Sequence, residues 1–118
     1  MSFKHATPIL PVLDFARAMA HYQQQLGFTK KWEWGEPASF GCVERDDVSI
    51  FLSAEDTRGS TRTAVFVDVK EVDALHREYL QSGATIREAP TDRPWGSREM
   101  LVEDLDGNRI RLASPSQK

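Results

Sequence analysis

The stretch 104-DLDGNRIRL-112 decides the fold, because its pattern occurs twice in the chain. Sixty residues earlier, 44-ERDDVSIFL-52 aligns with it without a gap. Each copy has a tight-turn pair followed by alternating apolar and other side chains, which is typical of a half-buried strand. Ile50 aligns with Ile110, while Phe51 aligns with Arg111. The pattern predicts a repeated hairpin with Phe51 and Arg111 on the strand face opposite the core.

The repeat extends outward from this stretch over most of the chain. The first half predicts a strand at 6–12, a helix capped by Asp14 that runs to Leu26 and ends at Gly27, and three strands within 28–53. The second half predicts a strand at 63–69, a helix that ends at Gly83, and three strands within 84–114. Both halves therefore read β-α-β-β-β. We expect an α+β fold and a single domain, 1–118, with an internal repeat of about 5–55 and 61–115.

Composition narrows the class of protein. The 118 residues are 40% hydrophobic and 28% charged, which is typical of one globular domain. No apolar run approaches the ~18 residues of a spanning helix, and the first residues lack the pattern of a signal peptide. The single cysteine, Cys42, excludes an intramolecular disulfide and favours a cytoplasmic location. A net charge of -3 without a basic stripe argues against nucleic acid as a partner.

The repeated motifs resemble the vicinal oxygen chelate superfamily, which includes glyoxalase I, extradiol dioxygenases and bleomycin-binding proteins. The resemblance covers nearly the whole chain and is carried by PVLDFARAMAHYQQQLGF (11–28), RDDVSIFLSA (45–54), TAVFVDVKEVDALHREY (63–79) and RPWGSREMLVEDLDGNRIRL (93–112). The last segment is most similar to the bleomycin resistance branch. The resemblance implies curled mixed sheets around a cavity, and a dimer that exchanges its N-terminal arms.

Metal-using relatives place one ligand on the first strand and one on the last strand of each module. The matching positions here are Thr7, Phe51, Thr63 and Arg111. A divalent cation of this class needs carboxylate or imidazole ligands, whereas Phe51 has no ligand atom and Arg111 only donates hydrogen bonds. We therefore predict no metal and no cofactor. The alternative is an enzyme, a glyoxalase-like lyase or isomerase, with a displaced metal site that uses His5.

Without a metal, recognition depends on shape, aromatic faces and a few polar groups. Flat aromatic walls suit planar ligands. The resemblance implies that bleomycin-type relatives clamp a planar drug at the subunit interface, and the positions that match those contacts include Trp32, Phe40, Ser53 and Trp95. We add Phe51 as the floor of the cavity, and Arg98 and Arg111 as polar contacts.

One position departs from the bleomycin branch. Lys31 stands where the resemblance implies an acidic residue, and a lysine repels a cationic drug tail by about 1 kcal/mol in water-like surroundings. Other planar ligands, or an acidic one attracted by Lys31 and Arg111, therefore stay open beside bleomycin.

The sequence thus predicts a non-catalytic protein that sequesters small planar cationic antibiotics of the bleomycin type and confers resistance. We expect a bacterial, cytoplasmic homodimer that binds neither nucleic acid nor membrane. The alternative is the metal-dependent enzyme, and a third hypothesis is a scaffold that binds a protein partner.

Overall fold

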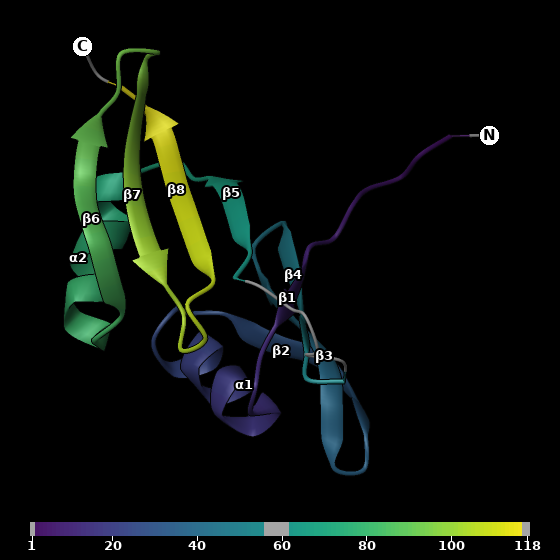
Figure 1. Cartoon of the computed structure of the whole chain (residues 1–118). Coiled ribbons are helices and arrows are strands. Elements are labelled where there is room, and N and C mark those ends of the chain that lie inside the picture. The colour runs from purple at the N-terminus through teal and green to yellow at the C-terminus, as the bar shows by residue number, and fades with distance from the viewer. Residues whose placement is uncertain (1, 56–61, 117–118) are drawn as a thin grey trace.

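The computed structural model describes residues 2–55 and 62–116. Each half of the chain has the element order β-α-β-β-β (Figure 1). The first half contains β1 (Ile9–Pro11), α1 (Phe15–Gln24), β2 (Thr29–Gly35), β3 (Ala38–Arg45) and β4 (Val48–Ser53). The second half contains β5 (Ala64–Asp68), α2 (Val72–Ser82), β6 (Thr85–Asp92), β7 (Ser97–Glu103) and β8 (Arg109–Pro115).

The strands form two separate four-stranded sheets with the same topology. The first sheet has the order β1-β4-β3-β2 and the second sheet the order β5-β8-β7-β6. In each sheet the outer strand, β1 or β5, pairs in parallel with its neighbour, and the remaining pairs are antiparallel. The predicted α+β fold with mixed sheets is confirmed. The repeat bounds stay predictions, and residue 61, where the second repeat was expected to begin, lies outside the described residues.

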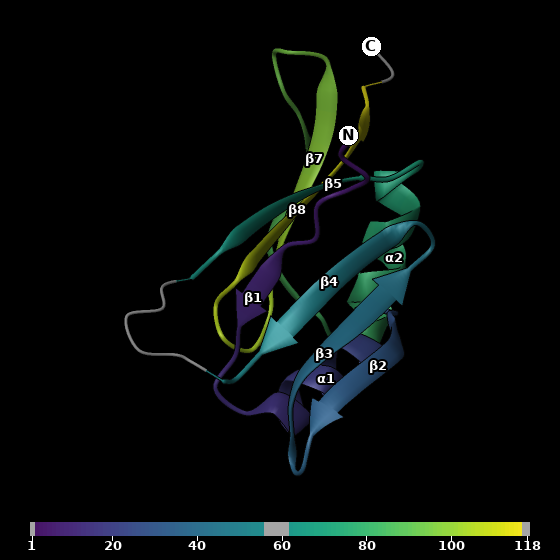
Figure 2. The ribbon, with the colours of Figure 1, turned by 90° about the vertical axis from the view of Figure 1, so that its right-hand side faces the viewer.

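One helix covers one face of each sheet. In Figure 1, α2 lies behind the second sheet, and in Figure 2, α1 lies behind the first sheet. The alternation along β4 and β8 explains this packing, since Ile50, Leu52, Ile110 and Leu112 are all buried in the core. The opposite face of each sheet carries no helix, and we call it the open face.

Some of the helix and strand ends agree with those that the local sequence pattern predicts, and others do not. Asp14 caps α1 by accepting a hydrogen bond from the Arg17 amide at 3.1 Å, and Gly83, with φ of 83°, ends α2 as predicted. The predicted end of α1 at Leu26 is wrong, because the helix stops at Gln24 and Leu26 turns into the core. The first strand is also shorter than predicted, since Pro8 and Pro11 lack the amide hydrogens that would extend its ladder.

The two halves meet where the β7–β8 turn packs against α1 and the segment before it, and we call this contact the closed junction. Asp104 is 6% exposed and accepts hydrogen bonds from the Tyr22 hydroxyl at 2.8 Å and the Asn108 side-chain amide at 2.9 Å. Asn108 also donates to the Pro11 carbonyl, and the Leu13 amide donates to Asp106. Buried polar groups from residues distant in the sequence thus hold the halves together.

The closed junction gives stability a pH dependence through His21. This side chain is 6% exposed and its Nε2 has no hydrogen-bond partner. Burial lowers the pKa of His21, although the carboxylates of Asp104 and Asp106 oppose the shift. Histidines of the unfolded chain titrate near pH 6.5. Below this pH, His21 therefore binds a proton more readily in the unfolded chain than in the folded chain. We expect the free energy of unfolding to fall as pH drops below that value.

Urea unfolding at about pH 7.5 and at about pH 5.5 measures this loss. The variant His21→Gln, which cannot titrate, is expected to lose less stability over this interval than the wild type. An equal loss in both proteins would assign the effect to other groups.

Candidate functional site

Three aromatic rings from three strands lie together on the open face of the first sheet. The ring centroids of Trp32 and Phe51 are 5.2 Å apart, those of Trp32 and Phe40 5.5 Å, and those of Phe40 and Phe51 5.4 Å. All three pairs are tilted or edge-to-face, and each such pair contributes roughly 0.5–1.5 kcal/mol beyond its buried area. Trp32 is nevertheless 38% exposed, so the cluster presents aromatic surface to a ligand. We call it the aromatic face.

Strand register explains why these residues gather. Cys42 on β3 lies opposite both Trp32 and Phe51, and Phe40 lies opposite Ser53. Directly opposed residues of antiparallel strands point to the same face, so Ser53 lies on the aromatic face, and its role as a polar contact stays a prediction. Cys42 is 1% exposed at the centre of this register, and its burial raises the pKa of the thiol.

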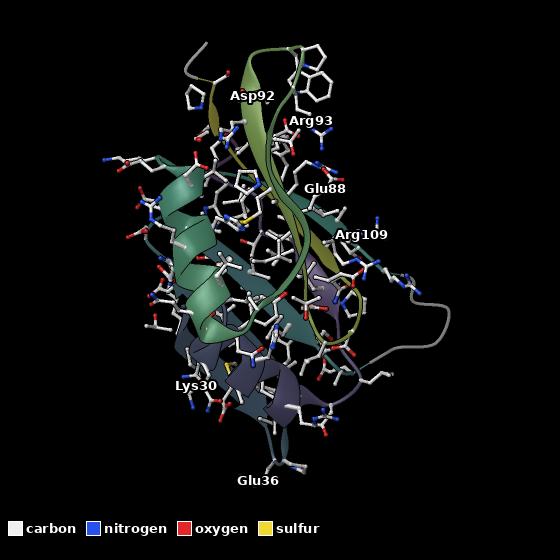
Figure 3. All side chains as sticks on the ribbon, turned by 90° about the vertical axis from the view of Figure 1, so that its left-hand side faces the viewer. Lys30, Glu36, Glu88, Asp92, Arg93 and Arg109 are labelled. Carbon is white, nitrogen blue, oxygen red and sulfur yellow. The ribbon has the colours of Figure 1, made fainter. Side chains whose placement is uncertain are left out.

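The open face of the second sheet carries a buried carboxylate between two arginines. Glu99 on β7 is 2% exposed, and accepts hydrogen bonds from the indole nitrogen of Trp95 at 2.9 Å and from Arg111 at 3.4 Å. The Arg93 Nε lies 3.8 Å from the same carboxylate, and the other end of Arg93 binds Glu88. Figure 3 shows Glu88 and Arg93 side by side at this end of the sheet. We call Trp95, Glu99, Arg111 and Arg93 the arginine face.

Glu99 stays ionised in this setting. Burial raises the pKa of its carboxyl, but hydrogen bonds from Trp95 and Ser97 and the charges of the two arginines outweigh burial and hold it below its ordinary value. The charged carboxylate in turn fixes the Trp95 indole and the Arg111 guanidinium. Arg111, on the strand face away from the core, pairs with Glu99 and keeps part of its guanidinium in solvent.

Arg98 does not join the other predicted site residues. Its guanidinium donates to both carboxylate oxygens of Asp73 on α2, at 2.9 and 3.1 Å, and to Asp92 at 3.3 Å. Because Arg98 precedes Glu99 in β7, strand alternation points it to the helix side of the sheet. Glu99, with Arg93, lies on the same face as Arg111, and a strict two-residue alternation over 97–103 indicates this. The role of Arg98 as a polar contact stays a prediction.

A single chain does not bring the two faces together. Figures 1 and 2 are a quarter-turn apart, and each shows the open face of a different sheet to the viewer, so the faces do not oppose each other. Trp32, Phe40, Phe51 and Ser53 lie on the first sheet, while Arg111 lies on the second sheet and Trp95 in its β6–β7 turn. Trp95 is 69% exposed. The predicted site is therefore divided into two half-sites.

The four positions that hold metal in relatives do not fit a divalent cation. Thr7 precedes β1 and Thr63 precedes β5, while Phe51 and Arg111 lie in the strands of different sheets. Phe51 offers no donor atom, and Arg111 places a permanent cation beside Glu99. Within residues 2–55 and 62–116, no group of three or more His, Cys, Asp or Glu side chains is placed to hold a metal ion.

The buried carboxylate yields a stability prediction with a control on the same strand. Glu99→Gln removes the charge between Arg93 and Arg111, and is expected to lower the free energy of unfolding by about 2 kcal/mol. Glu103→Gln changes a carboxylate whose arginine partners are exposed and 3.5–3.9 Å away, so its expected cost is below about 1 kcal/mol. Urea titrations compare the two variants, and equal losses would show that Glu99 has no special role.

The described part of the chain contains no helix long and apolar enough to cross a membrane.

The family model described as Glyoxalase/Bleomycin resistance protein/Dioxygenase superfamily matches residues 2–112. None of the curated proteins matches the chain. TnmS3, an antibiotic binding protein from Streptomyces sp. CB03234, has a similar structure, with 28% identity, a TM-score of 0.81, and coverage of 98% of this chain and 99% of that one.

Two further structures share the fold. TioX from Micromonospora sp. ML1 is 21% identical with a TM-score of 0.83, covering 95% of this chain and 99% of that one. A bleomycin-binding protein in complex with bleomycin is 21% identical with a TM-score of 0.79, covering 97% of this chain and 100% of that one. The chain belongs to the glyoxalase/bleomycin resistance protein/dioxygenase superfamily.

Proposed function

We propose that the protein is a non-catalytic binder that sequesters a planar antibiotic of the bleomycin type and so confers resistance. The observation that carries the proposal is the three-ring cluster of Trp32, Phe40 and Phe51, which remains accessible on the open face of the first sheet. Aromatic walls of this kind stack against planar ring systems. Similar structures include one antibiotic binding protein and one complexed with bleomycin. The free thiol of Cys42 suits the reducing cytoplasm, where we place the protein.

The complete cavity requires two copies of the chain. We propose a homodimer in which the aromatic face of one copy opposes the arginine face of the other, with the N-terminal arms exchanged. Large apolar side chains lie uncovered on both open faces, with Ile9 56% and Phe66 57% exposed. Contiguous exposed apolar surface marks interaction sites, and the edge strands β1 and β5 also need covering.

The charges near the half-sites define the ligands to test. The Lys31 ammonium lies 3.6 Å from the Glu44 carboxylate, which offsets part of its repulsion toward a cationic drug tail. On the other side of the cavity, the positive charges of Arg111 and Arg93 attract an acidic substituent of a ligand. We therefore rank bleomycin first and planar acids second.

The alternative, a metal-dependent lyase or isomerase, requires ligands that Thr7, Phe51, Thr63 and Arg111 do not supply. His5 is exposed in the segment before β1, and among the described residues it belongs to no group of three or more His, Cys, Asp or Glu side chains that could hold a metal ion. No observation favours this alternative over the binder.

The test is a calorimetric titration with bleomycin, both metal-free and copper-loaded. We expect binding of one drug molecule per chain, which Trp95→Ala abolishes. The control is Leu105→Ala, which truncates a side chain that is 52% exposed in the β7–β8 turn and belongs to neither face, and is expected to leave binding unchanged. Absence of heat and of fluorescence quenching would overturn bleomycin as the ligand.

A further inference from the structure

The two halves of the chain form a second junction, which the repeat makes equivalent to the closed junction. Tyr22 and Tyr79 each stand eight residues after the N-cap of their helix. At the closed junction, the Tyr22 hydroxyl donates to Asp104 in the β7–β8 turn. At the second junction, the Tyr79 hydroxyl donates to the Leu26 carbonyl at 2.8 Å, and not to the β3–β4 turn. Tyr79 therefore does not hold the β3–β4 turn against α2 in the way that Tyr22 holds the β7–β8 turn against α1.

A cleft of about 810 Å³ remains between this turn and α2, and we call it the junction cleft. This volume lies within the range of roughly 300–1,000 Å³ that small-molecule sites occupy. The floor is apolar and consists of the edges of core side chains, among them Phe28, Val67, Leu75 and Leu112. The cleft opens on the helix side of the sheets, and no residue of the aromatic or arginine face lines it.

The rim of the junction cleft concentrates the negative charge of the protein. Five of the 18 acidic residues of the chain line it, but only two of the 15 basic ones, which leaves 13 of each elsewhere. These charged residues are Asp46, Asp47, Asp68, Glu71 and Glu78, with Arg45 and Lys70. The rim of the junction cleft therefore carries a net charge of -3, which equals the net charge of the whole chain.

Of these five carboxylates, only Glu78 forms an ion pair with another described residue. Arg45 is occupied by Glu78, which accepts two hydrogen bonds from it at 2.7 and 2.9 Å. Glu71 stands at the N-cap of α2, and its side chain makes no capping hydrogen bond. Within the described ranges, Asp68 and Glu71 form no ion pair. Carboxylates beside an apolar floor attract a cation more strongly than carboxylates surrounded by water.

We infer that the junction cleft is a second binding site, for a small amphipathic cation. The apolar body of such a ligand lies on the floor, and its positive charge lies at the rim near Asp68 and Glu71. This inference is independent of the proposed antibiotic site, because the two sites share no residue. It predicts discrimination by charge between ligands of similar shape.

The test uses tetraphenylphosphonium and the uncharged triphenylphosphine oxide as probes on the full chain. Both probes are tetrahedral at phosphorus, so neither can lay more than a single phenyl ring flat against the aromatic face. We expect the cation to bind and to shift the backbone amide resonances of Val67, Val69 and Leu75, whereas the uncharged probe binds far more weakly. The double variant Asp68→Asn/Glu71→Gln is expected to weaken binding of the cation about fivefold and to leave the uncharged probe unaffected.

Two further variants complete the design. Ala74→Trp places a large side chain in the cleft from α2 and is expected to abolish binding, while thermal unfolding confirms that the variant folds. Glu36→Gln removes a charge at the β2–β3 turn, away from α2 in Figure 3, and is expected to leave the affinity unchanged. Equal affinity for both probes, equal losses in Glu36→Gln and the double variant, resonance shifts confined to the aromatic face, or no binding would each overturn the inference.

Discussion

Asp104→Ala is expected to lower the free energy of unfolding by about 4 kcal/mol. The carboxylate is 6% exposed and accepts four hydrogen bonds, from the Tyr22 hydroxyl, the Asn108 side chain, and the amides of Asp106 and Asn108. Removing it leaves those donors without an acceptor, and the Tyr22 hydroxyl belongs to a side chain that is 0% exposed. Burial, together with the charge of Asp104, also raises the pKa of Tyr22 well above its ordinary value, so the hydroxyl remains a donor.

The neighbouring Asp106→Ala is the matched control. Its carboxylate accepts one long-range hydrogen bond, from the Leu13 amide at 2.9 Å, so the expected cost is about 1 kcal/mol. A double-mutant cycle of Asp104→Ala with Tyr22→Phe isolates their shared hydrogen bond and should give a coupling above about 1 kcal/mol. Urea unfolding followed by circular dichroism measures the wild type, the three single variants and the double variant. If Asp104→Ala costs no more than Asp106→Ala, the closed junction does not hold the halves together.

Trp32→Ala is expected to weaken antibiotic binding about a hundredfold, since buried aromatic anchors contribute roughly 2–4 kcal/mol at such sites. The indole contacts both Phe40 and Phe51, so its removal takes away one wall and loosens the other two rings. Trp32 is 38% exposed in the single chain, and the loss of stability should therefore be small. Calorimetric titration measures the affinity, and sedimentation confirms that the variant keeps the oligomeric state of the wild type.

Trp34→Ala provides a control on the same strand. Trp34 is 64% exposed and forms none of the ring pairs of the cluster. Its truncation is expected to weaken binding less than about threefold. Equal effects at both tryptophans would mean that the three-ring cluster has no particular role in binding.

The sequence was sufficient for features that local rules determine. The aligned turns and the alternation after them predicted which residues of β4 and β8 enter the core, because burial on one face imposes a period of two. Asp14 and Gly83 marked helix ends through their own backbone preferences. Both rules act within a few residues.

The sequence was insufficient where contacts join distant segments. Asp104 reads as a turn residue, and it does bind the amides of its own turn, but its bond to Tyr22 spans 82 residues. The Glu99 network likewise depends on the pairing of β7 with β8 and on the return of the β6–β7 turn, which no local pattern encodes. Arg98 was predicted as a polar contact, whereas strand alternation turns it toward Asp73. The division of the site between two sheets follows from how the halves pack.

The central claim is that one antibiotic site combines the aromatic face of one copy with the arginine face of another. Mixing Trp32→Ala chains with Trp95→Ala chains tests it most directly. Each variant alone lacks one half of every cavity. In a mixed dimer, however, the intact first sheet of one chain meets the intact second sheet of the other.

Titration of the equimolar mixture, refolded together, is expected to recover tight binding at roughly a quarter of the sites, because half of the dimers are mixed and each has one complete cavity. No recovery above the two separate variants, in a mixture shown by mass spectrometry to contain mixed dimers, would contradict the claim.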